Sequence, residues 1–149
     1  LTGIPADTNT AALVEALRHH NVGYLPYSPL SAGVLSGKYA GRPAPPEGSR
    51  LSLFDSYFER YSKTVAPQCV DLYAKLALQH DLSPSALAIA FCDSRPFVTS
   101  TIVGATSLEQ LEVNLQGFGV DWTDALEDGV AKIHGFYPDP WRMIVRDGG

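Results

Sequence analysis

The residues best suited to ligand chemistry lie in two short stretches, each placed directly after a segment that favours a β-strand. The first, at 27–33, reads Tyr-Ser-Pro-Leu-Ser-Ala-Gly. Its Tyr27 ring can stack on a flat ligand, and Ser28 can donate hydrogen bonds from its hydroxyl and its backbone. Lys38 can bind a phosphate as a point charge, while Arg50 can offer a two-pronged guanidinium. A Ser-Pro turn with a solvated lysine and arginine is the alternative interpretation, which this stretch alone leaves open.

The second stretch starts at Gly104, where a β-branched run ends. Thr106, with Glu109 three residues later, fits a capping box, so we predict that a helix starts there. The N–H groups and the dipole at a helix start favour an anion, typically a phosphate. Gln110 and Asn114 share a helix face with Thr106, where their amides can bond an adenine or ribose edge. An ordinary strand–turn–helix with a solvated amide pair explains the same residues.

Helices and short extended segments alternate along the chain, and these elements must position both stretches. Ser83 before Pro84 is an N-cap followed by proline at the first helical position, which indicates a helix start. The other elements follow from apolar residues at helical spacing or from β-branched runs. We predict helices at 8–20, 54–61, 65–80, 84–93, 106–115 and 123–134, with strands at 24–27 and 99–103.

Strands that alternate with helices pair in parallel, so the predicted fold class is α/β. Two parallel strands alone do not make a stable sheet, and the pattern therefore predicts that further strands are missing. The first residue is Leu1 and the only methionine is Met143. We accordingly expect Leu1 to be an internal point of a longer chain, through processing or through an incomplete gene model. A Pro/Gly-rich loop at 40–50 is expected to be exposed.

Composition and charge exclude several classes of protein. The chain has 11 Lys and Arg against 16 Asp and Glu, a formal charge of −5, without the basic run that a nucleic-acid binder shows. No segment approaches the roughly 20 apolar residues that span a bilayer. Cys69 and Cys92 form neither a disulfide framework nor a metal knuckle, so we expect two buried thiols in a reducing compartment. We expect a cytoplasmic protein without metal, nucleic-acid or membrane partners.

Three segments, in this order along the chain, resemble aldo-keto reductases. Residues 27–39 (Tyr-Ser-Pro-Leu-Ser-Ala-Gly-Val-Leu-Ser-Gly-Lys-Tyr) are similar to the segment after the seventh barrel strand of that family. Residues 83–92 resemble the penultimate barrel helix, and 101–115 (Thr-Ile-Val-Gly-Ala-Thr-Ser-Leu-Glu-Gln-Leu-Glu-Val-Asn-Leu) the eighth strand and its helix. The likeness is to the bacterial-type reductases and the potassium-channel β subunits, and it runs from about residue 10 to residue 140.

The resemblance implies a (β/α)8 barrel that holds NADP(H) at the carboxyl ends of its strands. This chain would be the C-terminal part of an incomplete barrel, with two parallel strands and flanking helices over 1–140 and a tail at 141–149. Position by position, it implies that Tyr27 stacks on the nicotinamide and that the pyrophosphate is contacted by Ser28, Pro29, Leu30, Ser31 and Lys38. It implies that Arg50 reaches the adenosine phosphate end, that Asn114 contacts the adenine, and that the 2′-phosphate and adenosine are held by Gly104, Thr106 and Gln110. Val113 departs from the Glu that related sequences often have there.

The resemblance also implies a catalytic tetrad of Asp, Tyr, Lys and His on earlier strands, with the Tyr as general acid. Nothing in this sequence matches those positions, so we assign no catalytic residue. The leading hypothesis is an NADP(H)-dependent oxidoreductase that reduces a small carbonyl compound, with this chain as its cofactor-binding part. The alternatives are a non-catalytic NADP-sensing regulatory subunit and an inactive fragment, and the oligomeric state is left open.

Overall fold

The computed structural model describes residues 8–54, 59, 61 and 64–141. Its elements in chain order are α1 (Thr8–His19), η1 (Ser31–Ser36), α2 (Arg50–Leu53), α3 (Ala66–Gln79), α4 (Pro84–Asp93), α5 (Leu108–Gln116), η3 (Gly117–Gly119) and α6 (Asp124–Phe136), where η marks a 3-10 helix. None of the helices in these ranges is long and apolar enough to cross a bilayer.

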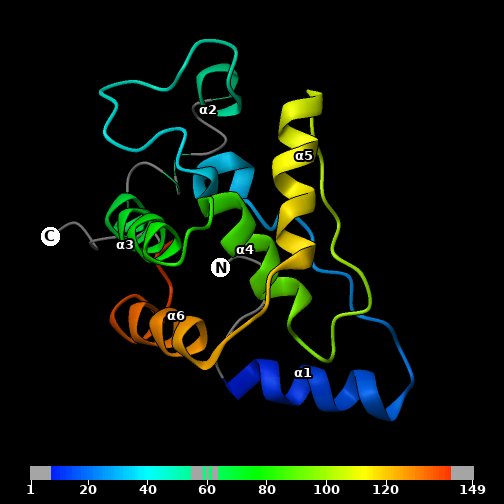
Figure 1. Ribbon diagram of the computed structural model, residues 1–149. Helices are drawn as coiled ribbons and strands as arrows, with labels where there is room; N and C mark the ends of the chain where they lie inside the picture. The colour runs from blue at the N-terminus through cyan, green and yellow to red at the C-terminus, as the bar shows by residue number, and fades with distance from the viewer. Residues whose placement is uncertain (1–7, 55–58, 60, 62–63, 142–149) are drawn as a thin grey trace, which may run out of the picture.

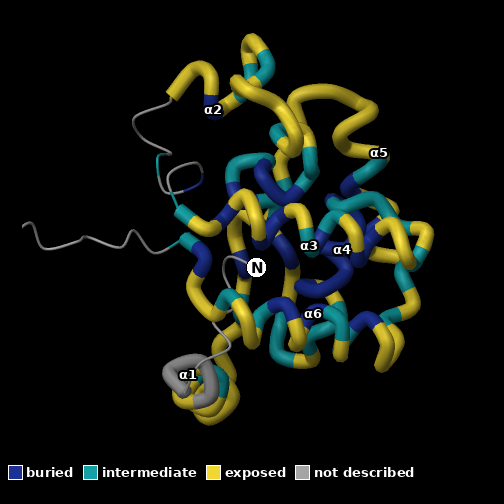
Figure 2. The backbone as a smooth tube through the Cα atoms, turned by 90° about the vertical axis from the view of Figure 1, so that its left-hand side faces the viewer, coloured by how far each residue is buried: buried dark blue, intermediate teal, exposed yellow. Residues whose placement is uncertain are grey.

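Helix α4 lies at the centre of the fold, with α3, α5 and α6 around it (Figure 1). It begins where the sequence predicts, because the Ser83 hydroxyl accepts a hydrogen bond from the Ala86 N–H at 3.1 Å and Pro84 opens the first turn. Every residue from Ser85 to Cys92 is buried, as the run of apolar residues on all sides of this helix requires. Figure 2 shows this buried centre, with the exposed helix α1 set apart below it.

Two extended segments pair in parallel beside this core. The pairing consists of two isolated bridges, Tyr24 with Val98 and Tyr27 with Ile102. The N–H groups of Thr99 and Ile102 donate to the carbonyls of Tyr24 and Pro26 at 2.9 and 3.0 Å. The predicted parallel direction is therefore confirmed.

The predicted strands at 24–27 and 99–103 are nevertheless wrong as continuous strands, since neither is one in the part of the chain that the structure describes. Pro26 has no N–H to extend the ladder, and the Tyr24 N–H donates to the Thr99 hydroxyl at 3.1 Å instead of to a carbonyl. The described residues thus give neighbouring extended segments and helices, and the larger barrel remains a proposal.

Four of the predicted helices are confirmed to within two residues at each end: 8–20, 65–80, 84–93 and 123–134. The helix predicted at 106–115 begins two residues later, because Ser107 rather than Thr106 is its N-cap and accepts from the Gln110 N–H at 3.3 Å. Residues 55–58 and 60 of the helix predicted at 54–61 lie outside the described residues, and the short helix α2 precedes that range. The 3-10 helices η1 and η3 are too short for helical periodicity to predict them, and η1 contains a kink at Ala32 and Gly33.

The expected tail begins with a packed residue. The Trp141 ring lies 5.0 Å from the Tyr61 ring, centroid to centroid, in an edge-on contact, and Pro140 before it is buried. Residues 142–149 lie outside the described residues.

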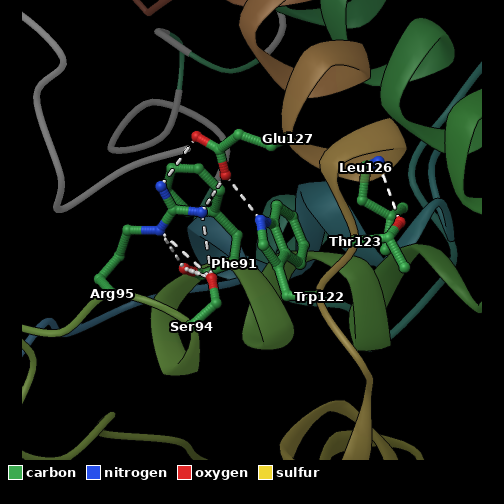
Figure 3. Close-up of polar contacts among 7 residues, drawn as sticks. All are labelled: Phe91, Ser94, Arg95, Trp122, Thr123, Leu126 and Glu127. Atoms are coloured by element: carbon green, nitrogen blue, oxygen red, sulfur yellow. Dashed lines mark hydrogen bonds and ion pairs between the residues drawn. The ribbon is translucent and has the colours of Figure 1, made fainter.

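A polar cluster joins the end of α4 to α6 (Figure 3). The Arg95 guanidinium pairs with both carboxylate oxygens of Glu127 and lies 4.3 Å from the centroid of the Phe91 ring. The Trp122 indole N–H donates to the same carboxylate at 2.6 Å. The hydrogen bond from Arg95 lowers the pKa of Glu127. This carboxylate therefore links the segment after α4 to α6, the last helix described.

Replacing Glu127 by Gln should lower the free energy of unfolding at pH 7 by about 1 kcal/mol. This effect is smaller than that of a fully buried ion pair, because 45% of the Glu127 side chain is exposed to solvent. Folding lowers the pKa of this carboxyl, so its stabilising effect is complete above the ordinary value of 4.5 and is lost as the pH falls through the lowered value. The difference in the free energy of unfolding between wild type and Glu127→Gln should therefore become smaller in acid. Denaturant unfolding over a pH series measures it, with the exposed Asp128→Asn as control; a gap that is constant with pH would contradict the assignment.

Candidate functional site

The turn after Tyr27 has a strained backbone. Ser28 has a φ of 54°, and Ser31, Ala32 and Gly33 follow in succession with φ of 49°, 60° and 89°. The left-handed conformation costs a non-glycine residue about 1–2 kcal/mol. Hydrogen bonds hold the turn, among them Ser31 N–H to the Ser28 carbonyl at 2.9 Å. Backbone strain of this kind gathers at functional sites, where the surrounding fold enforces it.

Lys38 folds back over this turn. A Cβ built on Gly33 would lie 2.8 Å from Cε and 2.9 Å from Nζ of Lys38, so the lysine side chain occupies the space that a side chain at position 33 would need. The Lys38 ammonium also lies 5.0 Å from the centroid of the Tyr39 ring. The positive charge is thus directed back toward the strained turn.

Arg50 is tied to the same region through its neighbour. The Leu51 N–H donates to the Tyr39 hydroxyl at 3.4 Å, which brings the end of the 40–50 loop to the residue beside Lys38. Arg50 itself is exposed at the first position of α2, and most of the 40–50 loop is exposed, as the sequence predicts. This hydrogen bond therefore connects the segment that carries Arg50 to the segment that carries Lys38.

The second stretch forms the start of α5. The backbone N–H and the hydroxyl of Thr106 both donate to Oε1 of Gln110 at 3.1 Å, so these two predicted ligand contacts are bonded to each other. Both residues are exposed, as is Gly104, where a Cβ would meet nothing within 4 Å. A hydrogen bond with the Ser107 hydroxyl lowers the pKa of the exposed Glu109 carboxyl in the first turn. The surface next to Gly104 is open to a ligand.

Asn114 faces the interior of the protein. Only 2% of it is exposed, and its Nδ2 donates to the Gly104 carbonyl at 3.4 Å. This hydrogen bond holds the Gly104 segment against α5. The contact to adenine that the resemblance implies for Asn114 stays a prediction, because the amide is engaged within the protein.

The two stretches leave the same edge of the paired segments. Tyr27 and Ile102 lie side by side in a parallel bridge, so Ser28 and Gly104 follow in the same direction. In Figure 1, η1 and the beginning of α5 accordingly lie in the same upper part of the molecule. The structure therefore brings together the two stretches that the sequence singles out.

The predicted contact residues differ in how far a ligand can reach them. Tyr27 is 71% exposed. The others that are exposed are Ser28, Lys38, Arg50, Gly104, Thr106 and Gln110. Pro29 and Ser31 are buried beneath the turn, and Leu30 is partly buried. These three shape the turn, whereas the exposed residues can contact a ligand directly.

Sequence reasoning missed two residues that shape the lysine's surroundings, Gly33 and Ser36. The Ser36 hydroxyl donates to the Gly33 carbonyl at 2.7 Å and accepts from the Lys38 N–H at 3.4 Å. The sequence signal for Gly33 is the pair of glycines at 33 and 37 before Lys38, since glycine readily adopts the positive φ, of 89° and 79°, that both have. No periodicity would have identified Ser36.

The cysteines lie away from this region and are free and buried, as predicted. Burial raises the pKa of both Cys69 and Cys92 to about 11, so both are thiols at neutral pH and poor nucleophiles. Within the described ranges, no three His, Cys, Asp or Glu side chains gather where they could hold a metal ion.

The sequence profile of the Aldo/keto reductase family matches residues 5–126. This chain therefore belongs to the aldo/keto reductase family, as the three resembling segments predict. The family has a (β/α)8 fold, and its members are generally NADPH-dependent oxidoreductases.

Several curated relatives are similar to this chain. Protein tas of Escherichia coli K12 is 36% identical over 128 residues, which cover 86% of this chain and 36% of that protein. An aldo-keto reductase of Babesia bovis is 35% identical over 137 residues, covering 87% and 47%. A putative voltage-gated potassium channel subunit beta of Schizosaccharomyces pombe is 36% identical over 118 residues, covering 76% and 33%. The chain thus spans between 33% and 47% of the length of these relatives.

Replacing Asn114 by Ala should free the Gly104 segment, because the buried amide that bonds its carbonyl is lost. We expect faster hydrogen exchange at the amides of 103–107 and a loss of about 1–3 kcal/mol in the free energy of unfolding. The exposed Gln116→Ala on the same helix is the control. Unchanged exchange at 103–107 in Asn114→Ala would show that the hydrogen bond does not hold the segment.

Proposed function

We propose that this chain carries the NADP(H)-binding part of an oxidoreductase that reduces a carbonyl compound by hydride transfer. The observation that carries the proposal is the parallel bridge between Tyr27 and Ile102, from which both candidate stretches leave at one edge. Membership of the aldo/keto reductase family supports the same cofactor. Lys38 and Arg50 supply the positive charge that a dinucleotide phosphate requires, and the open backbone at Gly104 leaves space for a ligand before α5.

The residues present fit a phosphate-bearing cofactor. The Lys38 side chain lies against the strained turn at 28–33, in the space that Gly33 leaves because it has no side chain. A Cβ built on Gly104 would meet no atom within 4 Å, so a ligand has room to lie close to the backbone there. An exposed tyrosine ring, 71% accessible, lies next to the turn and can stack on a flat heterocycle.

In this proposal NADPH, when bound, supplies the hydride for the carbonyl carbon. Tyr27 orients the nicotinamide by stacking, and Ser28 and Lys38 bind the pyrophosphate. Arg50, Thr106 and Gln110 bind the adenosine end, and this requires Gln110 to release Thr106 or to bind through its remaining donors. The positive charge of Arg50 at the adenosine end favours the extra phosphate of NADP over NAD. The chain thus binds and orients, and we assign it no catalytic residue.

We further propose that the described fold is the C-terminal part of a (β/α)8 barrel. Leu25 and Ile102, each 52% exposed, lie on the paired segments beside the exposed Tyr27, on the side that a barrel interior would cover. Helix α5 and η3 expose a stripe of large apolar residues at helical spacing: Leu108, Leu111, Leu115 and Phe118. Apolar faces of this kind need a cover, and further strands and helices of the same barrel would provide it.

Titration of the purified full-length protein with NADPH, followed by nicotinamide fluorescence, tests the proposed function. We expect saturable binding that is tighter for NADPH than for NADH. Replacing Lys38 by Met should raise Kd for NADPH by about 10–100-fold, since a charge-assisted phosphate contact is worth about 1.5–3 kcal/mol. The exposed Lys75→Met on α3 is the matched control and should bind as wild type does. Absence of any binding by the wild type would overturn the proposal.

The non-catalytic NADP-sensing subunit is the second candidate, and the similarity to the channel subunit beta of S. pombe favours it. Both candidates bind NADPH at the same residues, so binding does not separate them. Turnover does: oxidation of NADPH by the full-length protein in the presence of aldehydes and ketones supports the reductase. Tight NADPH binding without turnover, in a protein whose complete sequence lacks the Tyr or Lys of the tetrad, supports the sensor.

The isolated 149-residue chain tests the incomplete barrel. We expect this chain to aggregate or to unfold without cooperativity, because the exposed face of its paired segments and its apolar stripe on α5 would meet water. Size-exclusion chromatography and thermal unfolding measure this. A cooperative, reversible melt of a monomer would contradict the proposed missing cover.

A further inference from the structure

We propose that Gly33 and Ser36 are positioning residues that direct the Lys38 ammonium toward the cofactor phosphate. This inference rests on the proposed function, in which Lys38 binds the pyrophosphate. It assigns a specific task to two residues that touch the lysine and that no ligand contact requires.

Gly33 provides the space in which the lysine lies. A methyl group at this position would stand 2.8 Å from Cε and 2.9 Å from Nζ of Lys38, closer than real carbon contacts allow. Because the atoms that it meets are the end of a flexible side chain, the lysine would turn away before the backbone moved. An alanine at position 33 would therefore displace the ammonium.

Ser36 fixes the backbone from which the lysine starts. Its hydroxyl donates to the Gly33 carbonyl at 2.7 Å and accepts from the Lys38 N–H at 3.4 Å, so one side chain links the two positions. Gly37 between them has a φ of 79°, and its N–H donates to the Val34 carbonyl, which ends η1 and turns the chain back. The lysine side chain thereby returns to Gly33, at the end of the strained turn at 28–33.

Positive φ alone does not explain the role of Gly33. Gly41 also has a positive φ, of 66°, but a Cβ there would meet nothing within 4 Å. The two glycines share the conformational requirement and differ in the contact with Lys38. Gly41→Ala is therefore a control that reproduces the backbone strain of Gly33→Ala without displacing the lysine.

The test is a double-mutant cycle on the full-length protein, with NADPH as the titrated ligand. Gly33→Ala should raise Kd about tenfold in the wild type and less than twofold when Lys38 is already Met, since its effect then has no lysine to act through. Gly41→Ala should leave Kd within twofold. Ser36→Ala should raise Kd about threefold, again only when Lys38 is present, and it keeps the test open if Gly33→Ala does not fold.

The salt dependence of binding provides a readout that a general loss of stability would not move. If Gly33→Ala displaces the charge, Kd should rise less steeply with salt, to the slope found for Lys38→Met. The positioning role would be overturned if Gly33→Ala and Ser36→Ala raised Kd for NADPH equally with and without Lys38. It would also be overturned if the dependence of Kd on salt in Gly33→Ala were unchanged from wild type. Either result would leave the proposed function intact. A wild type that does not bind NADPH would overturn both.

Discussion

Backbone hydrogen bonds between two segments about 75 residues apart decide where the candidate site lies. The Ile102 N–H donates to the Pro26 carbonyl, and this contact places Tyr27 beside Ile102 in parallel. With an antiparallel pairing, the turn at 28–33 and the turn at Gly104 would leave from opposite edges, and no single ligand would reach both. The direction of this short pairing is therefore the condition on which the proposed phosphate-binding arrangement depends.

Helix α4 holds the elements of that arrangement together, because η1, α5 and η3 all pack against it. Its contact with η3 is close: a Cβ on Gly117 would lie 2.7 Å from Cβ of Ile89, so only glycine allows this approach. Helix α5 is anchored on its inner side by the polar Asn114 and exposes its leucines. The exposed leucines of α5 fit the proposed cover on the outer side of this helix.

Much of the fold could be predicted from the sequence where the signals are local. Ser83 and Pro84 specify the start of α4, and the apolar spacing of α3 and α6 specifies their extent. The start of α5 was predicted two residues early because Thr106 and Ser107 are both good caps and only geometry decides between them. The predicted site stretches do lie together, but the engagement of Asn114 with Gly104, and the contact of Gly33 with Lys38, depend on tertiary approach, which spacing does not encode.

The succession of left-handed residues at 31–33 has a consequence for how this protein can evolve. Only one of the three is glycine, so Ser31 and Ala32 hold an unfavourable conformation that a glycine would accept without steric strain. In a lineage selected for thermal stability, Ala32→Gly would relieve the steric strain of this turn. The same substitution would make the turn more flexible. Retention of alanine in such a lineage would indicate selection for rigidity over stability at this point of the surface.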